Sequence, residues 1–145
     1  MSYTNIILFL LLCASLLQVL ALEKRRCIFT YEYAVHVINK LPPNSAPLKL
    51  HCASKDDDLG NHTLPINQDY NWSFCNNIIY DTLFFCRLRW ESKEKAFDVF
   101  ESKWRSKCDT LYCYWMAKDD GIYFSKVDDL RSFTKEYDWD VRHMP

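Results

Sequence analysis

The chain divides into an apolar leader and a cysteine-rich body, and this division limits its possible folds more than any other feature. The first 21 residues hold no Lys, Arg, Asp or Glu and include the apolar run Ile6–Leu12. The leader ends in Val19, Leu20 and Ala21, a small-residue pattern that signal peptidase can accept. We therefore predict a signal peptide over residues 1–21, with cleavage after Ala21.

A transmembrane anchor is the alternative interpretation of this leader. Its apolar run falls short of the roughly 20 residues that a bilayer requires, and Gln18 interrupts it. No second apolar stretch of that length follows in the sequence. We expect a soluble, secreted, extracellular protein with no membrane insertion.

Cysteines dominate the body of the chain. Cys13 leaves with the leader, and six remain: Cys27, Cys52, Cys75, Cys86, Cys108 and Cys113. An even number in an exported chain of this size predicts three disulfides, although the count does not choose among the possible pairings. Zinc is the alternative, but no CxxC pair occurs. Two glycosylation sequons, which begin at Asn61 and Asn71, fit the same compartment.

Length and charge point to one soluble domain. Removal of the leader leaves 124 residues (145 minus 21), which suits a single domain with its own core. The formal net charge is −1 and both signs are interspersed, so nothing indicates a nucleic-acid partner. We predict an N-terminal extension at 22–34, one domain at 35–140 and a C-terminal tail at 141–145, and we expect a monomer.

Short strands at regular intervals, separated by polar or proline-containing turns, predict an all-β antiparallel sandwich or barrel. The strongest is Thr82–Trp90, where every second residue from Phe84 onward is apolar or cysteine. Other predicted strands are Tyr33–Asn39, Leu48–Cys52, Phe97–Phe100, Cys113–Ala117 and Ile122–Phe124. Asp56–Asn61 and Lys118–Gly121 are predicted turns. Val127–Trp139 fits either a helical turn or an edge strand.

Several motifs, taken together, resemble the plant self-incompatibility S-protein homologues. They are Val35–Leu41, Leu50–Gly60, Thr82–Cys86, Cys108 with Cys113, and Asp120–Tyr123. The resemblance runs in order from about Val35 to Trp139. It implies a small disulfide-stapled β-sandwich secreted to the apoplast, in a family whose founding members are stigma determinants that reject self pollen in poppy.

The resemblance also bears on the disulfides. The family pattern has four cysteines, and Cys27 and Cys75 depart from it. Cys52 and Cys113 both lie in phase with core residues, whereas Cys75 lies out of phase with its neighbours and is expected to point away from the core. We predict the pairs Cys52–Cys113, Cys86–Cys108 and Cys27–Cys75.

Nothing in the residues indicates catalysis. Gly60 and Gly121 are the two glycines of the chain, too few for a phosphate-binding loop or a dinucleotide fingerprint. GxSxG and HExxH motifs do not occur. His36 and His51 are expected at the surface rather than as general bases, and the acidic run Asp56–Asp58 lacks the spacing of a calcium-binding EF-hand loop. We expect no enzyme, no cofactor and no metal.

Recognition by exposed loops is the remaining possibility, because loops on a rigid scaffold can vary without disturbing the core. The candidate loops are 41–47, 54–68, 91–95, 101–109 and 118–121. Trp104, with Arg105 beside it, is our candidate partner contact, since aromatic and arginine side chains dominate binding hot spots. The equal alternative is that Trp104 caps the core.

Two functions of different class follow from this. The first is an extracellular signalling ligand of an unidentified cell-surface receptor protein, in self-incompatibility or another cell–cell recognition process. The second is an apoplastic glycan-binding module or an inhibitor of a secreted enzyme. Aromatic residues make up 16% of the chain, but they do not decide between these functions, because a sandwich core also needs large side chains.

Overall fold

The structure is a computed structural model that describes residues 2–21, 27–77, 79–104 and 106–142. Helix α1 (Tyr3–Ala21) covers the expected leader, and the rest of the described chain is built from strands, with one short 3-10 turn at Leu130–Ser132. Within these residues, no helix has both the length and the hydropathy needed to span a membrane. Leu22, the residue after the expected cleavage site, lies outside the described residues.

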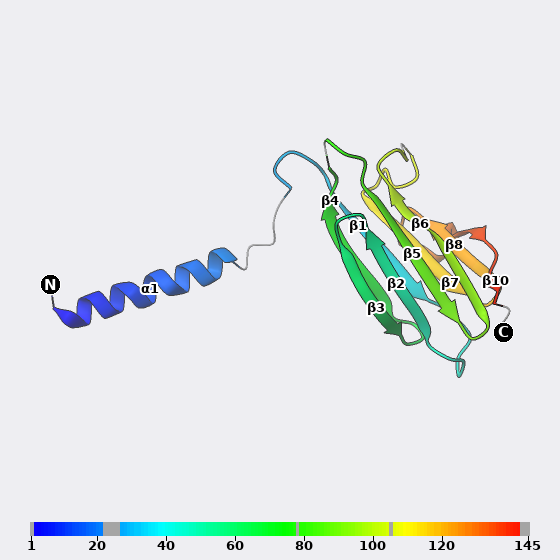
Figure 1. Ribbon diagram of the computed structural model, residues 1–145, viewed down its shortest axis with the longest axis horizontal. Coiled ribbons are helices and arrows are strands. Elements are labelled where there is room, and N and C mark those ends of the chain that lie inside the picture. Colours follow the sequence, from blue (N-terminus) through cyan, green and yellow to red (C-terminus); the bar gives the residue numbers. More distant parts are fainter. Residues whose placement is uncertain (1, 22–26, 78, 105, 143–145) are drawn as a thin grey trace.

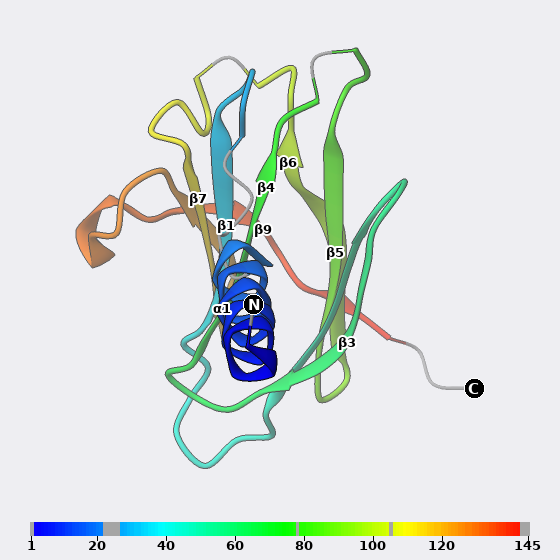
Figure 2. The ribbon, with the colours of Figure 1, turned by 90° about the vertical axis from the view of Figure 1, so that its left-hand side faces the viewer.

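Two five-stranded sheets pack face to face, and Figure 2 shows them as two layers. Sheet I has the strand order β4 (Asp69–Cys75), β1 (Glu32–Asn39), β7 (Tyr112–Lys118), β8 (Gly121–Ser125) and β9 (Thr134–Tyr137). Sheet II has the order β10 (Asp140–Val141), β6 (Lys93–Glu101), β5 (Leu83–Trp90), β2 (Leu48–Ser54) and β3 (Asp58–Leu64). The all-β sandwich is therefore confirmed. Neighbouring strands run antiparallel except β1 and β7, which are parallel.

Alternation along the strands builds the core between the sheets. In β5, Phe84, Cys86, Leu88 and Trp90 are buried, while the residues between them face solvent. At the centre, the fully buried Trp115 of sheet I donates its indole N–H to the Val99 carbonyl oxygen of sheet II at 3.0 Å. The core therefore links its two layers by a hydrogen bond as well as by apolar contact.

Two predicted loops form strands, and a third segment combines both of its predicted alternatives. Asp58–Leu64 forms edge strand β3 rather than a loop, and it is hard to recognise because Leu59 and Leu64 are its only large apolar residues. Strand β6 begins at Lys93, so the turn after β5 is only Glu91 and Ser92. The ambiguous segment after β8 contains both expected elements, the 3-10 turn at Leu130–Ser132 and edge strand β9.

The disulfides correct part of the predicted pairing. Cys27 pairs with Cys75 as predicted, but Cys52 pairs with Cys86, and Cys108 with Cys113. The predicted pairs Cys52–Cys113 and Cys86–Cys108 were wrong because position on the core face does not identify the partner. Register decides it: Cys52 and Cys86 lie directly opposite each other on β2 and β5, with their Cα atoms 4.1 Å apart.

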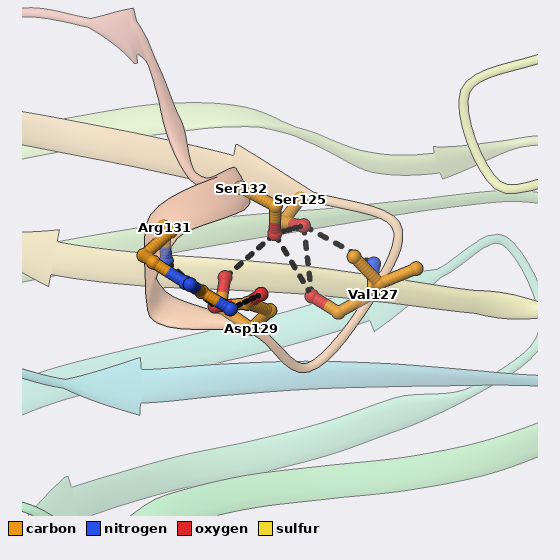
Figure 3. Close-up of polar contacts among 5 residues, drawn as sticks. All are labelled: Ser125, Val127, Asp129, Arg131 and Ser132. Carbon is orange, nitrogen blue, oxygen red and sulfur yellow. Dashed lines mark hydrogen bonds and ion pairs between the residues drawn. The ribbon is translucent and has the colours of Figure 1, made fainter.

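A cluster of polar contacts holds the connection between β8 and β9, as Figure 3 shows. The buried Ser125 hydroxyl donates to the Val127 carbonyl oxygen at 2.8 Å, accepts from the Val127 N–H at 3.1 Å and lies 2.6 Å from the Ser132 hydroxyl. Asp129 accepts from the backbone N–H of Arg131 at 3.0 Å and forms an ion pair with its guanidinium group. These contacts with Arg131 lower the pKa of Asp129, with the side-chain bond as the larger cause.

Candidate recognition surfaces

One end of the sandwich, which we call the apex, carries an unusual concentration of exposed apolar side chains. Three segments meet there: residues 27–31 before β1, residues 76–77 and 79–82 between β4 and β5, and residues 102–104 and 106–111 between β6 and β7 (Figures 1 and 2). Five large apolar residues on the first two segments are 71–84% exposed: Ile28, Phe29, Tyr31, Ile79 and Tyr80. We call these five residues the apex patch.

The first segment of the apex patch is fixed to strand β4. The Cys27–Cys75 disulfide brings the two Cα atoms to 5.5 Å. The backbone N–H of Asn76 also donates to the Tyr31 carbonyl oxygen at 3.2 Å. Ile28, Phe29 and Tyr31 are therefore tethered at both ends of their segment although their side chains face solvent.

The second segment is fixed by its own side chains. The Asn77 amide oxygen accepts from the backbone N–H groups of Ile79 and Tyr80 at 2.9 and 3.3 Å, which folds a tight turn. At the base of the segment, the Thr82 N–H donates to the Ser102 hydroxyl at 2.6 Å. That hydroxyl also lies 2.8 Å from the Asn76 amide oxygen. The turn thus presents Ile79 and Tyr80 on a supported backbone.

Trp104, the predicted partner contact, lies at the same end but is half-buried against the core. The ammonium group of Lys107 lies 4.7 to 4.9 Å from the ring centroids of Trp104, Trp115 and Phe124, and it forms an ion pair of 3.1 Å with Glu136. This cage closes the end of the core, so Trp104 has a packing role. Its contact with a partner stays a prediction, and Arg105 lies outside the described residues.

The outer face of sheet II carries a groove of about 560 Å³ over β2, β3 and β5, on the side that faces the viewer in Figure 1. All of its lining residues except Leu50 are polar, charged or aromatic: Lys49, His51, Asn61, His62, Thr63, Phe85, Arg87 and Arg89. The lining holds three fixed cations and no carboxylate. This groove is therefore basic although the whole chain carries a net charge of −1.

Two histidines form hydrogen bonds with aspartates on the outer faces. His36 lies 2.7 Å from Asp69 on sheet I, and His51 lies 2.7 Å from Asp58 at the edge of the groove. The Gly60 N–H and then His51 lower the pKa of Asp58. Among the residues that the structure describes, no group of three His, Cys, Asp or Glu side chains is placed to hold a metal ion.

Both sequon asparagines are exposed and lie on the outer faces of the sandwich. Asn61 on β3 is opposite His51 and lines the groove. Asn71 on β4 is opposite His36 of sheet I. Accessibility is necessary for modification, and glycosylation at both positions stays a prediction.

Residues 34–139 match the family model described as "Plant self-incompatibility protein S1". The chain belongs to this plant self-incompatibility family. No solved structure gives a significant match.

Relatives in Arabidopsis thaliana agree with this assignment. "S-protein homolog 5" is 43% identical over 76 residues, which is 52% of this chain and 58% of that relative. "S-protein homolog 2" is 33% identical over 115 residues, covering 76% of this chain and 70% of the relative. "S-protein homolog 24" is 31% identical over 136 residues, covering 93% and 86%. The match to homolog 5 thus spans little more than half of that relative's length.

Sequence reasoning missed the most prominent surfaces of this family member. Neither side of the apex patch was among the predicted recognition loops, because Ile79 and Tyr80 look like strand residues until the turn at Asn77 is seen. The groove is not evident from the sequence, because Arg87 and Arg89 fit the solvent face of any amphipathic strand. The signal was present in their spacing, since residues two apart on a strand share a face.

Proposed function

We propose that this self-incompatibility family member is a secreted, extracellular signalling ligand that a cell-surface receptor protein recognises through the apex patch. One observation carries the proposal: five large apolar side chains are 71–84% exposed on two segments, of which the first is bridged to the end of β4 by a disulfide and to the second by a backbone hydrogen bond. Contiguous exposed apolar residues mark interaction sites on soluble proteins.

The anchoring of the apex patch favours a protein partner. Binding costs conformational entropy for each side chain and loop that becomes ordered, and a preformed surface lowers that cost. Tyr31, Tyr80 and Phe29 are of the aromatic class that is enriched at interfaces. The partner that fits is a receptor protein with an apolar pocket.

Family membership supplies the biological setting of the proposal. The description of the family model names self-incompatibility. The process that we propose is therefore rejection of self pollen or another form of cell–cell recognition. The protein acts as a monomer in the apoplast and performs no catalytic step. No specific observation favours the alternative of an inhibitor of a secreted enzyme.

Binding to intact cells tests this proposal. The secreted protein is labelled and incubated with plant cells, including pollen tubes, with unlabelled protein as competitor and protease-treated cells as a control. Saturable binding that protease abolishes supports a receptor protein. Binding that does not saturate, or that survives protease treatment, contradicts it.

A further inference from the structure

We propose that the groove on the outer face of sheet II binds an acidic oligosaccharide through the carboxylates of its uronic acid units. This binding site is separate from the apex patch and does not depend on the receptor proposal. Three features of the groove support this ligand: the register of its three strands, the charges that this register brings together and the hydrogen-bond donors of its lining.

Strand register arranges the groove residues in two rows. Thr63, Lys49 and Arg89 lie opposite one another across β3, β2 and β5. Asn61, His51 and Arg87 form the next row. Neighbouring strands lie about 4.8 Å apart and residues two apart on a strand lie about 7 Å apart. The side chains of the groove thus form a grid with spacings of about 5 Å across the strands and about 7 Å along them, which suits a ligand with repeated polar groups.

The charges of this grid are only partly balanced by the protein. Lys49 and Arg89 are directly opposite, and like charges in that position destabilise a sheet. Glu94 contacts Nε of Arg89 at 3.3 Å, while Lys49 and Arg87 form no ion pair within the described part of the chain. An anion between these cations would remove their repulsion, which is the physical reason to expect an acidic ligand.

The remaining lining favours a carboxylated sugar over other anions. An arginine side chain can hold a carboxylate by two parallel hydrogen bonds. Thr63 supplies a neutral hydroxyl that can bond a sugar hydroxyl, and Phe85 is 39% exposed at the end of the cationic rows. Three fixed cations make a small footprint compared with the basic stripes of nucleic-acid-binding proteins.

The test measures affinity of the secreted full protein for a short oligomer of galacturonic acid. The comparison ligand is the methyl-esterified oligomer of the same length, which keeps the sugars and removes the charge. We expect binding to the acid form that weakens with added salt, and at least about tenfold weaker binding to the ester. Equal binding to both forms, or no binding to the acid form, overturns the proposal.

Variants place the binding in the groove. Arg87→Gln and Lys49→Gln are each expected to weaken binding about tenfold, whereas Arg87→Lys retains the charge and loses less. The matched control is Lys55→Gln, which removes an exposed cation outside the lining and is expected to leave affinity unchanged. These side chains are exposed, and circular dichroism checks that each variant folds. An equal loss in Lys55→Gln overturns the site.

Two further arms separate this ligand from other anions. Inorganic phosphate and a single-stranded oligonucleotide are tested as competitors at matched charge. Failure of both to compete supports a carboxylated sugar. Equal competition by either one overturns the proposal, because it would show a general anion site. The groove variants and an apex variant, Phe29→Ser, keep this result separate from receptor binding, since Phe29→Ser is expected to bind the oligomer normally.

Discussion

The side-chain amide of Asn39 donates a hydrogen bond of 2.8 Å to the carbonyl oxygen of Leu64, and so joins the end of β1 in sheet I to the end of β3 in sheet II. Its amide oxygen also accepts from the Leu41 N–H at 3.0 Å. Asn39 is fully buried, so both bonds are made away from water. This one side chain of sheet I therefore satisfies a backbone group at the end of β3 and another in the connection that leads from β1 to β2.

We predict that Asn39→Ala lowers the free energy of unfolding by about 1–3 kcal/mol, because it leaves the Leu64 carbonyl and the Leu41 N–H buried without these partners. Urea unfolding measures the change. Gln68→Ala is the matched control at the same end of the sandwich, since Gln68 is exposed and its loss is expected to change stability by less than about 0.5 kcal/mol. Equal effects of the two variants would contradict the role of Asn39.

Peptide mapping without reduction tests the disulfides directly. We expect cross-linked peptides that join Cys27 to Cys75, Cys52 to Cys86 and Cys108 to Cys113. A peptide that joins Cys52 to Cys113 would contradict the register of β2 and β5.

The three bridges are also expected to differ in their contribution to stability. In the chain-entropy model, the bridges with sequence separations of 48 and 34 contribute about 4 kcal/mol each, and the one with a separation of 5 about 2 kcal/mol. Replacing Cys108 and Cys113 together by Ala should therefore cost less than replacing Cys52 and Cys86. Thermal unfolding of the two double variants measures the order.

The fold class was predictable from the sequence, and specific pairings were not. Alternation along Phe84–Trp90 identified the central strand because burial of one face forces a period of two. The parallel pairing of β1 with β7 was not predictable, since no local pattern reports which distant strand lies alongside. The same limitation explains the disulfide error: the phase of Cys52 gives the face on which it lies, and the register of β2 against β5 gives its partner.

The recognition surfaces were less predictable than the fold. The apex patch depends on the Cys27–Cys75 bridge, which was predicted, and on the turn at Asn77, which was not. The groove depends on Lys49 lying opposite Arg89, which is a matter of register. Surface sites built from several strands become visible only when the strands are placed side by side.

We predict that Lys107→Met lowers the free energy of unfolding by about 1–2 kcal/mol. Methionine keeps the apolar stem but loses the charge that contacts the rings of Trp104, Trp115 and Phe124 and pairs with Glu136. The control is Lys126→Met, which breaks an exposed ion pair with Asp109 and should cost less than about 1 kcal/mol. If both variants lower the free energy of unfolding equally, the cage around Lys107 contributes no more stability than an exposed ion pair.

Burial of tyrosines predicts a loss of stability at alkaline pH. Burial is the main cause that raises the pKa of Tyr70, Tyr114 and Tyr137 above 10.0. Above about pH 10 the folded chain then binds more protons than the unfolded chain, so their stabilising contribution is complete below that pH and declines as pH rises. Unfolding at about pH 9 and pH 11 measures the decline, and Tyr137→Phe should reduce it. An unchanged decline in Tyr137→Phe would exclude Tyr137 as a source.

The central claim is that a cell-surface receptor protein recognises the apex patch. The most direct measurement is the saturable, protease-sensitive affinity for intact plant cells of three proteins: the unmodified chain, the apex variant Phe29→Ser with Tyr80→Ser, and the groove variant Arg87→Gln. Loss of two hot-spot aromatics should weaken binding at least about thirtyfold, while the groove variant binds like the unmodified chain. Equal affinity of the apex variant and the unmodified chain would contradict the account.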